Sequence, residues 1–100
     1  MIENLYIIGL NDSNIEELIS NIGYDNTLNL ACNYEIVKSN IDLLKSFGIT
    51  PIEELLLNRS FIFLDDPEDN TKKFAKFNIS VLVDLINNDY TTIDEVFDYN

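Results

Sequence analysis

Hydrophobic residues recur along the chain with the spacing of amphipathic helices. In residues 15–22 they stand at positions i, i+3, i+4 and i+7, which places four of them on one helix face: Ile15, Leu18, Ile19 and Ile22. On such a helix Glu16 and Glu17 point toward water. Gly23 ends it, because glycine readily adopts the left-handed conformation found at helix ends. The pattern therefore predicts an α-helix in this segment.

A second regularity is a unit of two blocks that occurs three times. The first block, with the shared frame apolar-x-x-apolar-Gly/Asn-Ile/Leu, covers residues 2–10, 41–49 and 71–79. The second block covers residues 15–19, 52–56 and 82–86. Gly9, Gly48 and Asn78 stand at the joints, where the left-handed backbone that stops a helix is tolerated. Such self-similarity predicts repeated helix-turn-helix units.

Residues that commonly cap helix N-termini precede the second blocks. The predicted caps are the capping boxes Ser13-x-x-Glu16, Thr50-x-x-Glu53 and Thr92-x-x-Glu95 and the plain N-cap Ser80. Pro51 is expected at the first helical position, where its missing N–H does no harm. The last capping box predicts a short helix that closes the stack near the C-terminal end.

The segments between these blocks are less regular. Asp66 followed by Pro67 is typical of an N-cap and a first helical residue, so we expect a helix from about Pro67 to Phe77. The apolar run Arg59–Leu64 fits a short helical or 3₁₀ turn better than a strand. Tyr24–Leu30 is the loosest part of the chain and is expected to be a loop that can include one helical turn.

Together these patterns predict an all-α protein: a short right-handed stack of about three helix-turn-helix repeats in one domain, with units at about 1–30, 31–64 and 65–100. The aromatic residues expected to pack between units are Phe61, Phe63, Phe74 and Phe77. Those expected to be exposed near the end of the chain are Tyr90, Phe97 and Tyr99. Cys32 is predicted to be a small buried apolar residue.

The middle of the chain also resembles a known repeat. Residues 44–56 contain Leu-x-x-x-Gly-Ile, a cap residue and Glu-Glu-Leu-Leu, and the segment Asn58–Leu64 follows. This order resembles the helical repeat of the mitochondrial transcription termination factor family, with Ser60 where that family has a proline. The resemblance implies a curved stack of helical units that holds nucleic acid on its concave side.

The net charge of the chain argues against nucleic-acid binding. Eighteen acidic residues against six basic ones give a net charge of -12, which repels phosphate backbones. Lys72, Lys73 and Lys76 form the one basic cluster, and they are interpreted first as a solvated face that complements a helix C-terminus. Nucleic-acid binding through these lysines is kept as the alternative.

Composition also narrows the chemistry. The chain has no histidine, three glycines and one cysteine, so most catalytic and phosphate-binding constellations are unavailable, and we expect a protein that is not an enzyme and has no cofactor. The oxygen-rich run at residues 65–70 lacks the spacing of a calcium loop and is interpreted as helix capping, with no metal site.

With no signal segment and no apolar run near the roughly 20 residues of a membrane span, a cytoplasmic location without membrane insertion is expected.

The hypothesis that follows is an acidic module that binds a protein with a basic surface, including the case of an inhibitor that mimics nucleic acid. The residues predicted to contact the partner are Glu16, Glu17, Glu53, Glu54, Asp65, Asp66, Glu68 and Asp69. A structural protein that self-assembles through uncapped repeat ends is a further alternative.

Overall fold

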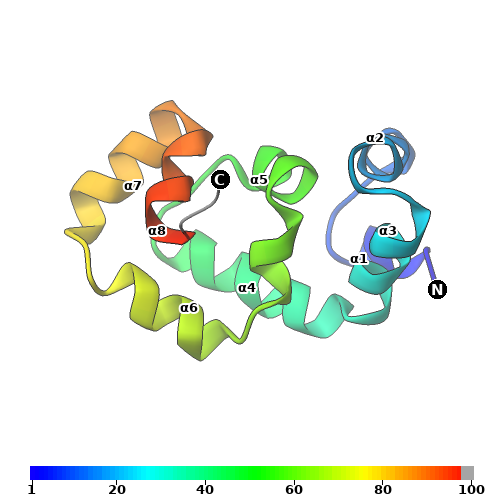
Figure 1. Cartoon of the computed structure of the whole chain (residues 1–100), viewed down its shortest axis with the longest axis horizontal. Coiled ribbons are helices and arrows are strands. Elements are labelled where there is room, and N and C mark those ends of the chain that lie inside the picture. The colour runs from blue at the N-terminus through cyan, green and yellow to red at the C-terminus, as the bar shows by residue number, and fades with distance from the viewer. Residues whose placement is uncertain (98–100) are drawn as a thin grey trace.

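A computed structural model describes residues 1–97, and all regular elements in that range are helical (Figure 1). In chain order they are α1 (Asn4–Ile7), α2 (Asp12–Ile22), α3 (Tyr24–Cys32), α4 (Tyr34–Ser46), α5 (Ile52–Asn58), η1 (Ser60–Leu64), α6 (Pro67–Phe74), α7 (Ile79–Asn88), η2 (Tyr90–Ile93) and α8 (Asp94–Phe97), where η marks a 3₁₀ helix. The prediction of an all-α fold is confirmed.

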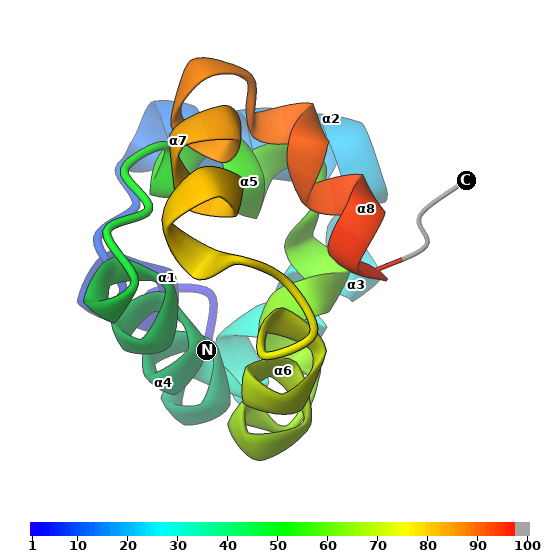
Figure 2. The same ribbon diagram turned by 90° about the vertical axis from the view of Figure 1, so that its left-hand side faces the viewer.

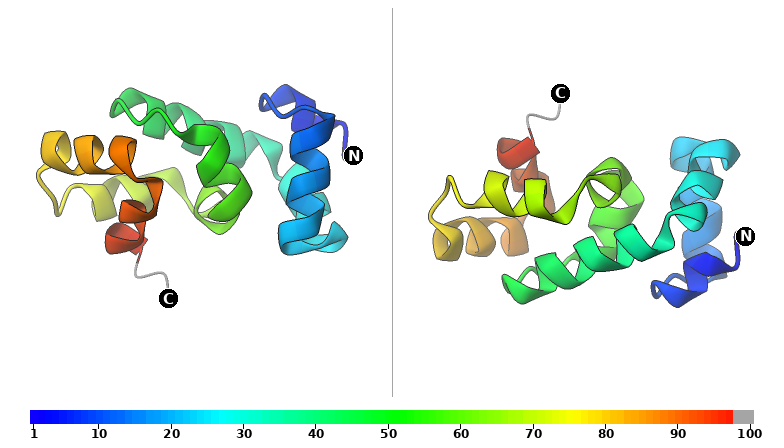
Figure 3. Two further views of the ribbon diagram at one scale, coloured as in Figure 1. Left: turned by 90° about the horizontal axis from the view of Figure 1, so that it is seen from above. Right: turned by 90° about the horizontal axis from the view of Figure 1, so that it is seen from below.

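The helices form one small domain with a two-layered arrangement. α2, α5 and α7 follow one another along the longest axis, which measures 37 Å, and α4 and α6 lie in the other layer (Figures 1 and 2). α4 is the longest helix, and it packs against α1, α3, α5, η1 and α6. Seen from above, α2 and α7 occupy opposite ends of the molecule (Figure 3). No helix within residues 1–97 has the length and apolarity needed to cross a bilayer.

Two of the predicted joints end their helices in the same way. Gly9 and Gly48 have φ angles of 98° and 95°. Any residue with a side chain would be strained in this backbone conformation. The next residue then donates its N–H back into the helix, from Leu10 to the Leu5 carbonyl and from Ile49 to the Leu44 carbonyl, each at 3.1 Å. Leu10 and Ile49 are buried behind these turns. Gly23, with φ 87°, ends α2 as expected.

The third joint was predicted wrongly. Asn78 has φ -74° and is the N-cap of α7, where its side chain accepts the N–H of Val81. The preceding helix α6 already ends at Phe74, so the expected end at Phe77 is also too late. Asparagine tolerates the left-handed conformation but is also a favoured N-cap residue, and here capping prevails.

The predicted caps are displaced by one to three residues. α2 begins after Asn11, which forms a capping box with Asn14, so neither Ser13 nor Glu16 is its cap. The other N-cap positions are held by Pro51 for α5, Asn78 for α7 and Asp89 for η2, and this replaces the predictions made for Thr50, Ser80 and Thr92. Several residues that can cap a helix stand close together at each site, and tertiary contacts help to decide which of them becomes the N-cap. For example, the Thr50 N–H is bound by Asn87.

The connecting segments were predicted with mixed success. Asp66 caps α6 by accepting the Glu68 N–H, and Pro67 is the first helical residue, as expected. The 3₁₀ helix η1 and the short helix α8 are also confirmed. The loop expected at Tyr24–Leu30 is wrong, because this segment is the first part of α3. Its buried residues Thr27, Leu30 and Ala31 follow helical spacing that its polar composition conceals.

Burial corrects five side-chain predictions. Phe63 and Phe74 are fully buried, but Phe61 and Phe77 are exposed. Cys32 is exposed because it lies one residue beyond the buried stripe of α3, at the last position of that helix. Tyr90 and Phe97 are half-buried against the core, so their predicted exposure is wrong, and Tyr99 lies outside the described residues.

Two buried asparagines connect three elements of the core. Asn40, on α4, is 1% exposed and donates from Nδ2 to the carbonyls of Phe63 at 2.9 Å and Asp65 at 2.8 Å. Asn70, on α6, is 2% exposed and donates to the Asn40 Oδ1 at 3.0 Å and the Ile62 carbonyl at 2.9 Å. Within residues 1–97, Asn70 Oδ1 has no hydrogen-bond partner. The pair therefore anchors η1 and the start of α6 to α4.

We predict that Asn40→Ala lowers the free energy of unfolding by about 2–4 kcal/mol, because it removes the side-chain partner of the Phe63 and Asp65 carbonyls and of one N–H of the Asn70 amide. Asn70→Ala removes fewer hydrogen bonds and should be less damaging. Urea unfolding followed by circular dichroism measures both, with the exposed Asn88→Ala as control, expected within about 0.5 kcal/mol of the original chain. An effect of Asn40→Ala as small as that of the control would contradict this role.

Candidate functional site

The acidic residues predicted to contact a partner separate into two groups. Glu16, Glu17, Glu53 and Glu54 lie on α2 and α5, which pack against each other. Asp65, Asp66, Glu68 and Asp69 lie before or within the first turn of α6, in the other layer (Figures 1 and 2). The eight residues therefore do not form one continuous surface.

The contact between α2 and α5 depends on two asparagines of α2. Asn14 donates from Nδ2 to Glu53 Oε1 at 2.6 Å, and Asn21 donates to the Leu57 carbonyl at 2.8 Å. Asn14 also accepts the Asn11 N–H at 3.0 Å in the capping box. One buried side chain thus begins α2 and orients a carboxylate of α5. No local pattern indicates this role of Asn14, because its partner Glu53 is 39 residues away.

We call the exposed carboxylates of these two helices the acidic ridge: Asp12, Glu16, Glu17, Glu53 and Glu54. Neither helix carries a lysine or arginine, and none precedes Lys38 in the chain. Lys45, on α4, shares a surface depression with Glu53 at the edge of the ridge. The ridge can attract cationic side chains. Asp12 belongs to it although it was not among the predicted contact residues.

The second acidic group has a local role in the helix that it begins. Asp66 Oδ1 accepts the Glu68 N–H at 2.9 Å, and Glu68 and Asp69 stand in the first turn of α6. Negative charge is favoured there by the helix dipole. The interpretation of this run as helix capping is confirmed.

The three lysines of the alternative prediction all lie at the end of α6 or just after it. Lys72 and Lys76 are exposed, and Lys73 is half-buried with its Nζ 5.1 Å from the centre of the Phe97 ring. Lys72 and Lys73 occupy the last turn, where cations complement the helix dipole. Elsewhere, Arg59 is bound to Asp94 by two hydrogen bonds of 2.7 and 3.0 Å. The basic charge at this end therefore lies on α6 and on the turn that follows it.

Two exposed hydrogen bonds shift acid–base equilibria near the helix ends. Tyr6 donates its hydroxyl to Asp12, and this bond raises the pKa of Tyr6 above its ordinary value. Asp89 accepts from the hydroxyl and the N–H of Thr91, and these bonds lower the pKa of Asp89. Both shifts follow from local turns, and the Tyr6 bond attaches α1 to the start of the acidic ridge.

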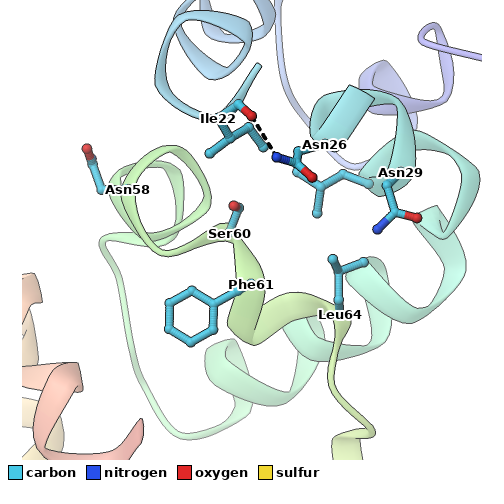
Figure 4. A pocket seen from close by; sticks show the side chains of 8 residues that line it. Ile22, Asn26, Asn29, Asn58, Ser60, Phe61 and Leu64 are labelled. Carbon is cyan, nitrogen blue, oxygen red and sulfur yellow. Dashed lines mark hydrogen bonds between the residues drawn. The ribbon is translucent and has the colours of Figure 1, made fainter. Parts of the chain in front are cut away.

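A neutral pocket that the sequence did not suggest lies between α3 and the segment joining α5 to η1 (Figure 4). It encloses about 280 Å³, at the lower end of ligand-sized cavities. Its polar lining consists of Asn26, Asn29, Asn58 and Ser60. Asn26 already donates to the Ile22 carbonyl at 2.8 Å, and Leu64 closes the side formed by η1. The lining side chains in the described part of the chain include no acid or base, so the pocket offers amide and hydroxyl hydrogen bonds to a neutral group.

Comparison of the chain with protein-family models, with curated proteins and with solved structures gave no significant match.

We predict that Asn14 and Glu53 are energetically coupled through their hydrogen bond. Replacing both with alanine should lower the free energy of unfolding by less than the sum of the two single replacements, with a coupling energy of about 0.5–1.5 kcal/mol. The measurement is a double-mutant cycle of Asn14→Ala and Glu53→Ala by urea unfolding. Glu54→Ala, one residue away and without this bond, is the matched control, and equal coupling to Asn14 would contradict the assignment.

Proposed function

We propose that the protein is a short stack of three helix-turn-helix units that acts, without catalysis, as a protein-binding module, and that its acidic ridge engages a basic surface of the partner. The observation that carries this proposal is the ridge. Five exposed carboxylates stand on two packed helices that have no basic residue.

Several features support the stack of units. The turns at Gly9 and Gly48 share one hydrogen-bond pattern. Equivalent positions of the first block are buried in all three copies, as Leu5, Leu44 and Phe74. The elements α4, α5 and η1 are followed by the same order in α6, α7 and η2, two α-helices and then a 3₁₀ helix. This agrees with the resemblance of the sequence to a helical-repeat family, and the right-handed sense of the stack is part of the proposal.

Electrostatics favour a basic protein over nucleic acid as the partner. Attraction between the ridge and cationic side chains acts within about 8 Å at physiological ionic strength, so it depends on local charge at the contact. The ridge is uniformly negative, whereas the lysines of α6 share their helix with Glu68 and Asp69. A protein surface that binds nucleic acid is basic and would fit the ridge, which is the form of the proposal in which the chain competes with nucleic acid.

We predict that a fluorescent deca-lysine peptide binds the chain and that Glu16→Gln/Glu17→Gln/Glu54→Gln weakens binding about tenfold, equivalent to about 1.4 kcal/mol. Neutralising the ridge removes the attraction without changing side-chain size. Fluorescence anisotropy at about 20 and 150 mM salt measures the affinity, which should fall as salt rises.

The matched control is Glu68→Gln/Asp69→Asn/Asp84→Asn, which removes the same charge from α6 and α7. It should weaken deca-lysine binding less than about twofold. Equal losses in both triple variants would show that the peptide responds to net charge and would reject the ridge as a site. Tight binding of a DNA or RNA oligonucleotide at low salt, abolished by Lys72→Gln/Lys76→Gln, would favour the nucleic-acid alternative.

A further inference from the structure

A surface depression with apolar walls adjoins the acidic ridge. It lies between the turn that joins α1 to α2 and the neighbouring parts of α4 and α5, and it has a volume of about 200 Å³. Five aliphatic side chains line it: Ile8, Leu10, Ile41, Ile52 and Leu56. Ile8 and Ile52 are half-buried, so they still offer apolar surface to a partner. The ridge therefore has an apolar surface at its edge.

The charged groups beside this depression are opposite in sign. Glu53 belongs to the ridge, and its hydrogen bond from Asn14 holds the carboxylate toward α2. Lys45, which is exposed on α4, brings a positive charge to the same depression. The two charges offset each other, so a cationic side chain gains little by entering. An apolar side chain gains more, because it leaves water and contacts the aliphatic wall.

A second apolar surface lies at the start of the ridge. The Tyr6 hydroxyl bonds to Asp12, which holds the tyrosine ring beside that carboxylate, and Tyr6 is 51% exposed. Aromatic rings attract the cationic heads of lysine and arginine, and the aliphatic stems of these residues cover apolar surface. A lysine or arginine that approaches Asp12 therefore contacts a carboxylate and a ring together. Asn14 joins this part of the ridge to Glu53 and the depression, because it lies in the capping box that begins α2.

We propose, on the basis of the function proposed for the ridge, that the partner presents a basic segment with one large aliphatic side chain among its lysines or arginines. The aliphatic side chain occupies the depression, and the cationic residues around it bind the carboxylates of the ridge. Small-molecule pockets measure roughly 300–1,000 Å³, so a depression of about 200 Å³ suits a single side chain better than a separate ligand. Side chains that fill such pockets commonly dominate the affinity of an interface.

The apolar contact gives the ridge a selectivity that charge alone does not provide. Attraction between the ridge and lysines weakens as salt rises, because the charges are screened. Burial of an aliphatic side chain does not depend on charge. The preference for a segment that contains such a side chain should therefore persist at physiological salt, while the affinity for every basic segment falls.

Two fluorescent peptides of equal charge test the proposal: deca-lysine with a leucine inserted at its centre, and deca-lysine with a serine inserted there. By anisotropy, the leucine peptide should bind the chain about five- to tenfold more tightly, with a similar ratio at about 20 and 150 mM salt. Ile8→Gln should reduce this preference below about twofold and leave the affinity for the serine peptide unchanged. Ile36→Gln is the matched control and should keep the preference, since Ile36 is 41% exposed on α4 and does not line the depression.

A measurement on the original chain avoids any effect of substitution on folding. In the complex with the leucine peptide, nuclear Overhauser effects should connect the methyl groups of the peptide leucine with those of Ile8 and Ile52. Equal affinity for the two peptides would overturn the proposal. So would leucine contacts that lie only elsewhere on the chain, a preference that survives in folded Ile8→Gln, or an equal loss in Ile36→Gln.

The ridge variant Glu16→Gln/Glu17→Gln/Glu54→Gln separates this test from that of the proposed function. It should weaken binding of both peptides by the same factor and leave the preference for leucine intact, because these three residues do not line the depression. If neither peptide responds to the ridge variant, the proposed function fails and this proposal fails with it. If both respond equally but neither is preferred, only the role of the depression is rejected.

Discussion

The hydrogen bonds of Asn40 hold together the parts of the fold on which the surfaces depend. α4 is the axis of the molecule, and the chain that leaves α5 must return to it before α6 can begin. Asn40 binds this returning segment at two carbonyls and is itself bound by Asn70 of α6. A buried amide with its donors and acceptor engaged allows one arrangement of these elements, whereas an apolar contact would tolerate several. The orientation of α6, and through it the far end of the molecule, follows from this constraint.

A buried asparagine has a similar role at the other end of the molecule, where Asn14 takes part in the capping box of α2 and contacts α5. In both places an asparagine supplies directional bonds inside a contact that is otherwise made by leucine, isoleucine and phenylalanine. The apolar residues supply most of the driving force for packing, and the amide hydrogen bonds fix how the packed elements are placed relative to each other. This explains why a chain with such a plain hydrophobic pattern has defined surfaces at each end.

The sequence by itself determined the helical class, because the spacing of apolar residues is a local property, and it located the turns at Gly9, Gly48 and Gly23, where the backbone needs glycine. It also identified the cap at Asp66 and four of the five carboxylates of the ridge, all except Asp12. Tertiary structure decided the rest. The choice of Asn11 over Ser13 as a cap, the burial of Asn40 and Asn70, the helix at Tyr24–Cys32 and the exposure of Leu85 all depend on which elements pack against one another. These contacts join residues far apart in the chain, and a local pattern holds no information about a partner 30 or 39 residues away.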